Sequence, residues 1–491
     1  MSNRRGGTSI SLILATTLAL MAAAGAAFAE EAVSPAHIKT DTGSSEYAVD
    51  LERALGIAIT NNFDLKVIKA QKGIQDLIIR ESWRDFFPTL SISYLQTEEK
   101  RKRDTDSRQH KLGIDSNITV FDGGRRSLAY DAARLKSILA RNDYRIALNN
   151  FIDGVSKAYF QILQSRETVK IHAKTLENSA MQLTFIKKEL ELGEATKLDA
   201  LAIEAKVKEV ELNLEKARDD YVQTVSRFKL LLKVESRAPL EVTGDIERDF
   251  IFHPPGNRID EDLLVSLALK NRKEVESASL EYRIAKATLR ISERYYYPKL
   301  GFGINYSQTD DDFFPREKGW GVNLQISSML WGNSGAVNAG YTESGNGNSK
   351  ALSNSDSVNI LDSLSYRRSI LESTINYKSA GEKKKTIRQQ IALEVSALAA
   401  AVGNSWKMIE IAKKQLELYD SFLVIERLKA NMGESRRYDL VKKELERGEA
   451  AISHLNSLVS YLVASSSLEL AAGVDIGFFK LTSMKSRRKH E

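Results

Sequence analysis

The sequence has 491 residues, of which 42% are hydrophobic and 28% are charged, and its formal net charge is +6 at pH 7. This length suits two or three domains of average size, and the small positive balance does not favour a nucleic-acid-binding protein. The chain contains no cysteine, which excludes disulfides, thiolate metal sites and lipid attachment to cysteine.

Residues 1–29 have the form of a secretory signal peptide. Arg4 and Arg5 precede an apolar run that ends in the letters AFA, a small-x-small cleavage site. A membrane-spanning anchor is the alternative, but small residues dominate the end of the run and acidic residues follow at once. No later stretch reaches the roughly 18 consecutive apolar residues of a spanning helix. We therefore expect an exported protein that begins with a flexible periplasmic N-terminus at 30–46.

Two long spans of the chain, 89–238 and 316–491, contain no proline and are therefore free to form very long helices. In the first span, apolar positions advance by alternating steps of four and three over residues 155–190, and the pattern resumes over residues 203–232. This heptad pattern predicts coiled-coil-type helices on either side of Gly193.

The chain contains an internal repeat. At an offset of 210 residues, RDFFP at 84–88 aligns with RYYYP at 294–298, and at an offset of 240 residues Gly193 aligns with Gly433. The second copy therefore has a net insertion of 30 residues. Residues 340–359, rich in glycine, serine and asparagine, are predicted to form a flexible loop. Each repeat is predicted to contain a helix, two strands and a long helical hairpin.

The predicted strands alternate large apolar residues with small or polar ones. They span 89–98 and 111–121 in the first repeat and 299–309 and 319–329 in the second. Such runs of about 10 residues are typical of strands that face lipid on one side and water on the other. A hairpin packed on a soluble core is the alternative. Four strands cannot enclose a usable lumen and lipid does not tolerate open edges, so several chains must share one barrel.

Several motifs together resemble the TolC-like outer-membrane channels of Gram-negative export systems, from about residue 47 to 475. They are FDGGRR at 121–126, the repeated x-Pro-x-Leu strand entries, the repeated Gly-x5-Asp turns and NNFDL at 61–65, where the family usually has proline in place of Phe63. The resemblance implies a mostly α fold with a membrane β-barrel part. Three copies would share a 12-stranded barrel and a long α-helical periplasmic tunnel. It also implies a strand-to-helix turn at Asp122, Gly123 and Gly124.

The predicted segments follow from the repeat and the resemblance. They are a signal peptide (1–29), a flexible N-terminus (30–46), repeat 1 (47–239), a linker (240–259), repeat 2 (260–475) and a basic C-terminal tail (476–491).

Gly193 and Gly433 are predicted to be the turns at the periplasmic tips of the two hairpins, because glycine readily takes the left-handed conformation that ends a helix. A plain kink in one long helix is the alternative. With Glu194 and Glu434, these glycines are expected to form the tips on which an adaptor docks.

The resemblance also implies an entrance lined by residues just after the second tip. Asp439 matches a family aspartate of the aperture, where three copies would form a cation-attracting ring, and Asp199 retains its family identity in the first repeat. The next family aspartate falls at Lys442. The family's closing arginine and tyrosine fall at Ser435 and Ala430, so the usual closing bonds are not expected here. Ordinary surface charges in the first turn of a helix are the alternative for both aspartates.

Catalysis has little support, since the six histidines are scattered and no HExxH, Walker or G-x-S-x-G motif is present. We expect no enzyme, no metal site and no cofactor. The prediction is a trimeric channel in the outer membrane, in contact with its lipid and with no nucleic acid. It would be the passive exit duct of a tripartite efflux or type I secretion system, gated at its periplasmic tip by a periplasmic adaptor and an inner-membrane pump or ABC exporter. A periplasmic coiled-coil adaptor is the alternative, although adaptors normally have one hairpin flanked by soluble β domains. An outer-membrane enzyme is the third possibility.

Overall fold

A computed structural model of the chain describes residues 47–99, 107–235, 240–250, 252, 260–311, 315–330, 333–344, 349–361, 365–432 and 434–474. The predicted signal peptide 1–29, N-terminus 30–46, basic tail 476–491 and tip residue Gly433 lie outside these residues. The chain divides into two compact units, Met1–Tyr47 and Ala48–Glu491, and the arrangement below concerns the second.

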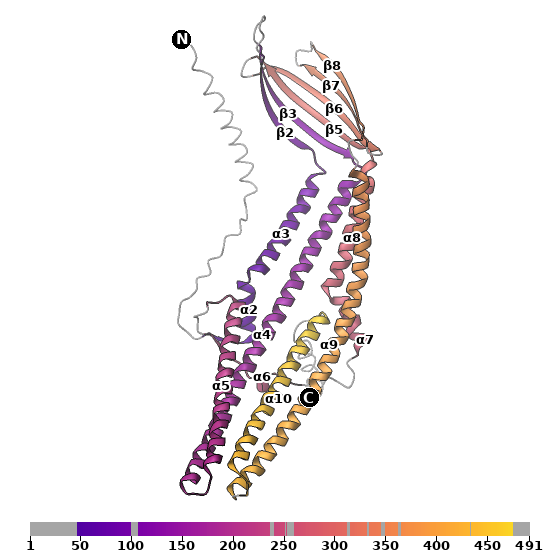
Figure 1. The fold of residues 1–491 in the computed structure, drawn as a ribbon. Helices are drawn as coiled ribbons and strands as arrows, with labels where there is room; N and C mark the ends of the chain where they lie inside the picture. The colour runs from indigo at the N-terminus through magenta and orange to yellow at the C-terminus, as the bar shows by residue number, and fades with distance from the viewer. Residues whose placement is uncertain are drawn as a thin grey trace, which may run out of the picture. The chain divides into compact units, whose positions relative to one another are not determined.

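The described residues are mostly helical, with a six-stranded and a two-stranded sheet (Figure 1). The helices are α2 (Leu51–Asn61), α3 (Phe63–Arg84), α4 (Arg125–Glu191), α5 (Lys197–Leu232), α6 (Ile246–Asp249), α7 (Glu261–Asn271), α8 (Lys273–Glu293), α9 (Ser365–Asn431) and α10 (Arg437–Ala471), with a 3-10 turn η1 (Arg294–Tyr296). The strands are β1 (Tyr47–Val49), β2 (Thr89–Glu99), β3 (Ser107–Phe121), β4 (Leu240–Val242), β5 (Lys299–Asp310), β6 (Glu317–Leu330), β7 (Asn333–Ser344) and β8 (Lys350–Asn359). Helices α4 and α9, at equivalent places in the two halves, each span 67 residues.

The break between the two helices that precede each strand pair is set by one extended residue. Asn62 ends α2 and caps α3, because its side chain accepts a hydrogen bond from the N–H of Leu65 at 2.9 Å. Phe63 is thus the first residue of α3, the helical position that proline also favours. In the second half Arg272 separates α7 from α8 with a similar extended backbone but without a side-chain cap.

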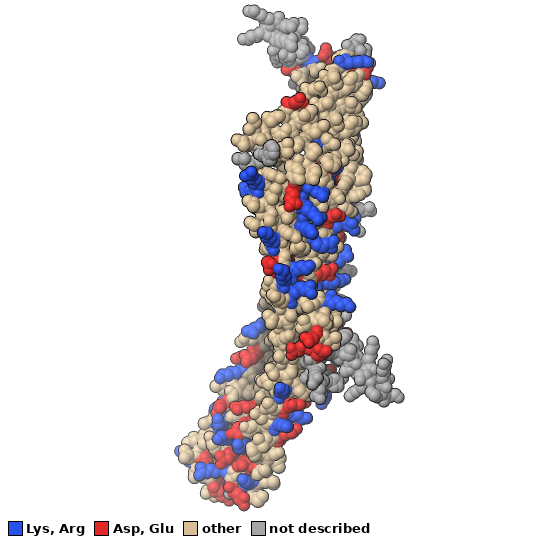
Figure 2. Space-filling view, turned by 90° about the vertical axis from the view of Figure 1, so that its right-hand side faces the viewer, with Lys and Arg blue, Asp and Glu red and all other residues tan. Residues whose placement is uncertain are grey.

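The six-stranded sheet is antiparallel, with the order β2-β3-β5-β6-β7-β8. The pairing of β3 with β5 joins the two repeats. Apolar side chains stand opposite one another on one face, as in the pairs Phe302↔Leu324 and Ile304↔Val322, and glycine and polar residues lie on the other. The sheet end of the face shown in Figure 2 is largely free of charge, whereas Lys, Arg, Asp and Glu gather over the helices. Strand β3 begins four residues before the predicted strand 111–121.

The prediction of a flexible loop at 340–359 was wrong, because most of these residues belong to β7 and β8. Strand β7 pairs with β6 from Gly319↔Ser344 to Leu330↔Asn333. The glycine, serine and asparagine that suggested a loop supply the polar face of these strands, and pairing with neighbouring strands outweighs their weak strand propensity. Each chain therefore has six strands in this sheet, where four were predicted.

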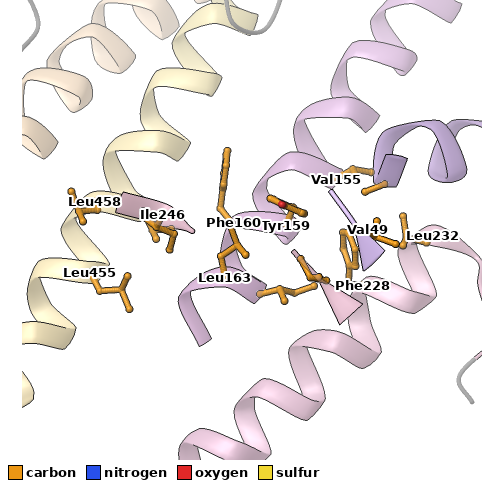
Figure 3. Close-up of a cluster of buried hydrophobic side chains, with 14 of the residues drawn as sticks. Val49, Val155, Tyr159, Phe160, Leu163, Phe228, Leu232, Ile246, Leu455 and Leu458 are labelled. Atoms are coloured by element: carbon orange, nitrogen blue, oxygen red, sulfur yellow. The ribbon is translucent and has the colours of Figure 1, made fainter. Parts of the chain in front are cut away.

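The main hydrophobic core joins the two helical hairpins. Its side chains include Val155, Tyr159, Phe160 and Leu163 of α4, Phe228 and Leu232 of α5, Leu455 and Leu458 of α10, and Val49 and Ile246 (Figure 3). Helix α6 contributes Ile246, which is 1% exposed, and β4 pairs with β1. The predicted linker 240–259 is thus, in its first part, a packed segment of the core.

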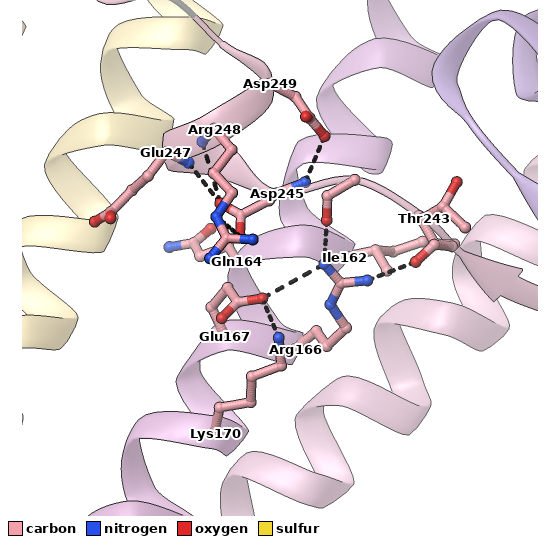
Figure 4. A network of polar contacts seen from close by, with 12 residues as sticks. Ile162, Gln164, Arg166, Glu167, Lys170, Thr243, Asp245, Glu247, Arg248 and Asp249 are labelled. Carbon is pink, nitrogen blue, oxygen red and sulfur yellow. Dashed lines mark hydrogen bonds and ion pairs between the residues drawn. The ribbon is translucent and has the colours of Figure 1, made fainter.

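Polar contacts fix this segment to α4 (Figure 4). The guanidinium of Arg166 donates to the carbonyl of Val242 at 2.6 Å and to the carbonyl of Gly244. The hydroxyl of Tyr159 donates to the carbonyl of Thr243. Asp245 caps the short helix α6, since its carboxylate accepts the N–H groups of the second and third residues that follow it. Backbone carbonyls that would otherwise be buried without partners are thereby satisfied.

Candidate functional site

The sheet passes into α4 through a turn at Gly123 and Gly124. Their φ angles are +70° and +77°, in the left-handed region that favours glycine. A Cβ atom added at Gly123 would lie 2.6 Å from the Cβ of Tyr297, and one added at Gly124 would lie 2.8 Å from an Nη atom of Arg294. Glycine is required here both by conformation and by the close approach of the second repeat.

Asp122 and Arg126 tie this turn to its surroundings. The Asp122 carboxylate accepts the N–H groups of Gly124 and Arg126, both at 3.0 Å, and the Arg126 Nε at 3.2 Å. The same guanidinium donates to the carbonyls of Asp85 at 2.9 Å and Thr119 at 2.5 Å. One side chain thus connects the entry to β2, the end of β3 and the start of α4. The motif is a structural joint between sheet and helix.

The first helical hairpin turns at Gly193, which has a φ of +80°. Helix α4 ends at Glu191 and α5 begins at Lys197 and packs back along α4 (Figure 1). The N–H of Glu194 donates to the carbonyl of Glu189 at 2.8 Å, which satisfies one of the carbonyls at the end of α4. The geometry is a turn between two helices and not a kink in one.

Asp199 forms a capping box with Thr196 at the start of α5. Its carboxylate accepts the Thr196 hydroxyl at 2.5 Å, and the Thr196 Oγ1 accepts the N–H of Asp199 at 3.2 Å. These hydrogen bonds, and the nearby positive charge of Arg436, lower the pKa of the exposed Asp199 carboxyl. Asp199 therefore stabilises the first turn of α5 through this cap.

The second hairpin turns between α9 and α10. The hydroxyl of Ser435 donates to the carboxylate of Glu426 on α9. Glu434, Asp439 and Lys442 are exposed, and the last two lie in the first two turns of α10. No hydrogen bond or ion pair of the Asp439 carboxylate is found among the residues that the structure describes. Asp439 therefore differs from Asp199, because its charge is not used in a capping box.

Arg437 joins the two hairpins close to their tips, a role that was not predicted from the sequence. Its guanidinium pairs with Glu189 of α4, donates to the Oε1 of Gln182 at 3.3 Å, and lies 5.0 Å from the ring centroid of Phe185. A cation in the first turn of a helix opposes the helix dipole. Two adjacent arginines at positions 436 and 437, at the start of a predicted helix, therefore indicate that a nearby carboxylate binds one of them.

Glu444 lies on α10 and is 3% exposed. One carboxylate oxygen accepts a hydrogen bond from Arg427 of α9 at 3.0 Å, and the other is buried with no hydrogen-bond partner in the described part of the chain. Burial raises the pKa of this carboxyl, and the neighbouring Arg427 guanidinium opposes that shift. The protonated form is therefore favoured by the fold more than in an unfolded chain.

Within the described ranges, no group of three or more His, Cys, Asp or Glu side chains is arranged to hold a metal ion. None of the helices that the structure describes is long and apolar enough to cross a membrane.

The raised pKa of Glu444 predicts a pH-dependent stability difference. Its contribution to the free energy of unfolding is fully present below the ordinary carboxyl pKa and is lost as the pH rises through the raised value. Glu444→Gln removes this titration. We expect the melting temperature of the natural protein minus that of the variant to be larger at pH 4 than at pH 8. Expressed as a free energy of unfolding, the change between the two pH values is expected to be on the order of 1 kcal/mol, the cost of a buried polar atom without a partner.

Circular dichroism melts of both proteins at the two pH values measure this difference. Glu434→Gln, at an exposed tip position, serves as the control and should give the same difference at both pH values. An unchanged difference for Glu444→Gln would contradict the prediction.

Comparisons with known proteins agree with this architecture. The family model described as outer membrane efflux protein matches residues 54–232. The outer membrane efflux protein BepC of Brucella suis biovar 1 (strain 1330) is 26% identical over 292 residues, which are 58% of this chain and 62% of that protein. The match thus spans less than two thirds of the length of BepC.

Solved structures with low sequence identity share the fold. The Campylobacter jejuni CmeC outer membrane channel has a TM-score of 0.69 and 14% identity, over 89% of this chain and 88% of CmeC. The outer membrane protein VceC from Vibrio cholerae has a TM-score of 0.71 and 13% identity, over 87% of this chain and 96% of VceC. Residues 54–232 thus match the outer membrane efflux protein family, and the chain has the fold of these solved outer-membrane channels.

Proposed function

We propose that three copies of the chain form a channel across the outer membrane, the passive exit duct of a tripartite efflux or type I secretion system. The two-faced sheet carries this proposal. Phe302, Ile304 and Leu324 stand on its apolar face and are 39%, 51% and 45% exposed in the single chain. Lipid would cover this face, and the polar face would line water. Because hydrocarbon excludes open strand edges, the copies close a barrel together, and β2, β3, β5 and β6 supply 12 of its strands.

The long helices support a periplasmic duct. At about 1.5 Å per residue, α4 and α9 are each about 100 Å long. The buried side chains of α5 follow the predicted heptad steps, as at Ile203, Val207, Val210 and Leu214. In the proposed assembly α4, α5, α9 and α10 of three copies form the tunnel wall. The channel does no chemistry, and cargo moves when an inner-membrane pump or ABC exporter and an adaptor engage it.

The tips are the proposed gate. Arg437 holds α10 against α4 within one copy, and Val441, which is fully buried, packs in one apolar cluster with Ile186 and Ile203. Release of Arg437 would allow the second hairpin to move outward. Gly193 and Glu194, with their counterparts Gly433 and Glu434, form the tips on which the adaptor docks. A related protein, the Neisseria gonorrhoeae MtrE outer membrane channel, has been solved in an open state, and the proposal extends such opening to this chain.

Assembly is the first test. The strand edges of a single chain cannot face lipid, so the sheet must close by pairing with other copies. Three copies can do this with cyclic symmetry. Native mass spectrometry of the protein in detergent should give three times the mass of the mature chain. A monomer, or chemical cross-linking that stops at dimers, would overturn the proposal.

Removal of the tip contact is expected to favour the open channel. Arg437→Ala should raise the open probability in planar bilayers roughly tenfold, the ratio for a lost interaction of about 1.4 kcal/mol. Glu189→Gln should act in the same direction, and the double variant should differ little from Arg437→Ala, because both changes remove one interaction.

The matched control is Arg218→Ala, which removes an exposed ion pair with Glu215 at 2.7 Å within α5. This control should conduct like the natural protein. Fully additive effects of the Arg437 and Glu189 changes would show that the two residues do not act together in the gate.

Ion selectivity tests the aperture. If three Asp439 carboxylates converge at the entrance, they attract cations, and Lys442, three residues along α10, tempers their field. Asp439→Asn should lower the cation selectivity measured from reversal potentials in a salt gradient, and Lys442→Asp should raise it. Glu177→Gln, an exposed change on α4, should leave it unchanged. Natural selectivity in both tip variants would exclude Asp439 from the constriction.

A further inference from the structure

The β7–β8 hairpin continues the sheet edge to edge and does not lie across either face. Strand β7 is paired with β6 along its full length, and β8 is paired with β7 from Ser334↔Asn359 to Glu343↔Lys350. The hairpin therefore turns at the end of the sheet that is remote from the helices, as do the β2–β3 and β5–β6 hairpins (Figure 1).

Strand β7 also continues the two faces of the sheet. Val337, Ala339 and Tyr341 stand opposite Ile326, Leu324 and Val322 on the apolar face. On the polar face Asn338, Gly340 and Thr342 stand opposite Gln325, Asn323 and Gly321. The ring centroids of Trp320 and Tyr341 are 5.5 Å apart. These sets of pairs match the alternation expected of a membrane strand.

Strand β6 has the packing of an interior strand. A Cβ atom added at Gly321 would meet Asn305 of β5 on one side, and on the other would lie 2.8 Å from the Cγ2 of Thr342 in β7. A Cβ added at Gly340 of β7 would lie 2.8 Å from the Oγ of Ser353 in β8. Glycine at these two positions makes room for the side chains of the added strands. An edge strand needs no such room on its free side.

The free edges of the sheet are β2 and β8. Apolar side chains near both edges are among the most exposed, with Leu90 and Ile92 of β2 at 68% and 63% and Leu352 and Val358 of β8 at 77% and 74%. Asn354 and Asp356 share the apolar face of β8. Asp356 lies three residues from the helical end of its strand, where an outward-facing charge costs less than at the midplane of the membrane.

The β2 and β8 edges have the lengths and directions needed to pair with one another. They have 11 and 10 residues, and they run in opposite directions because the six strands alternate. Even-numbered residues form the apolar face of both β2 and β8. If the two strands pair with their apolar faces on the same side, each even-numbered residue of β8 must therefore stand opposite an even-numbered residue of β2.

We propose that the β7–β8 hairpin is a third membrane hairpin, an inference that rests on the channel proposed above. The β8 edge of one copy pairs with the β2 edge of the next, so each copy contributes six strands and a third turn at the cell surface. The barrel is then wider than one built from four strands per copy.

The position of the turn is tested first. Because the natural chain contains no cysteine, Ser349→Cys introduces a single reactive thiol beside the β7–β8 turn. A membrane-impermeant maleimide should label it in intact cells as strongly as Asp311→Cys beside the β5–β6 turn. Glu194→Cys, at the periplasmic tip, should label only after the outer membrane is permeabilised. Labelling of Ser349→Cys only after permeabilisation would overturn the inference.

The pairing of β8 in one copy with β2 in the next, called the seam below, is tested by disulfide cross-linking in the assembled protein. Ser355→Cys on the polar face of β8 is combined with Ser91→Cys or Ser93→Cys on the polar face of β2, and oxidation should link copies into ladders on gels. Gln325→Cys on β6, combined with the same β2 variants, should give none. The reverse pattern would overturn the inference, because β6 would then form the seam. A trimer mass with that reverse pattern would leave the proposed channel intact.

Discussion

A backbone N–H or C=O group in hydrocarbon has no water to bind, so every strand of a membrane sheet must have a neighbour on both sides. The six-stranded sheet meets this requirement everywhere except along the outer edges of β2 and β8. The apolar face of the same strands is equally unsuited to water. In the proposed channel, the constraint on hydrogen bonds calls for pairing between copies, and the apolar face calls for a position in lipid.

The contacts at the junction between sheet and helices differ in strength from those at the tips of the helical hairpins. The Asp122–Arg126 joint combines glycines that allow no side chain with several charge-assisted hydrogen bonds. At the far end of the helices, Arg437 pairs with Glu189 between the two hairpins, and Val441 packs against Ile186 and Ile203. Glu444 is bound by Arg427 within the second hairpin, and one of its carboxylate oxygens has no partner in the described part of the chain. Regions with few buried contacts open at the lowest free-energy cost. A rigid joint and weakly held tips suit a duct that opens at one end.

Much of this fold could be predicted from the sequence, because residue spacing alone records the strand alternation of β5 and β6 and the heptad steps of α5. In the second half of α4 the buried positions, such as Gln182 and Ile186, lie one residue before the predicted ones. The capping box at 196–199 was also readable from its residue types. The β8 strand was not, since Asn354 and Asp356 separate Leu352 from Val358 on its apolar face, and its alternation becomes clear only beside β7. Arg437 was missed because its partner Glu189 lies 248 residues away in the chain.

The equal lengths of α4 and α9 have an evolutionary consequence. One residue inserted into a helix turns everything beyond it by about 100° and advances it by about 1.5 Å. A single insertion in α4 would therefore rotate its buried seam away from α5 and displace the first tip relative to the second. Only matched additions of whole heptads to the hairpin helices would preserve both. The two repeats of this chain differ in length instead between β6 and α9, where the second repeat carries its extra hairpin. The length of the helices is therefore more constrained than the number of strands in the sheet.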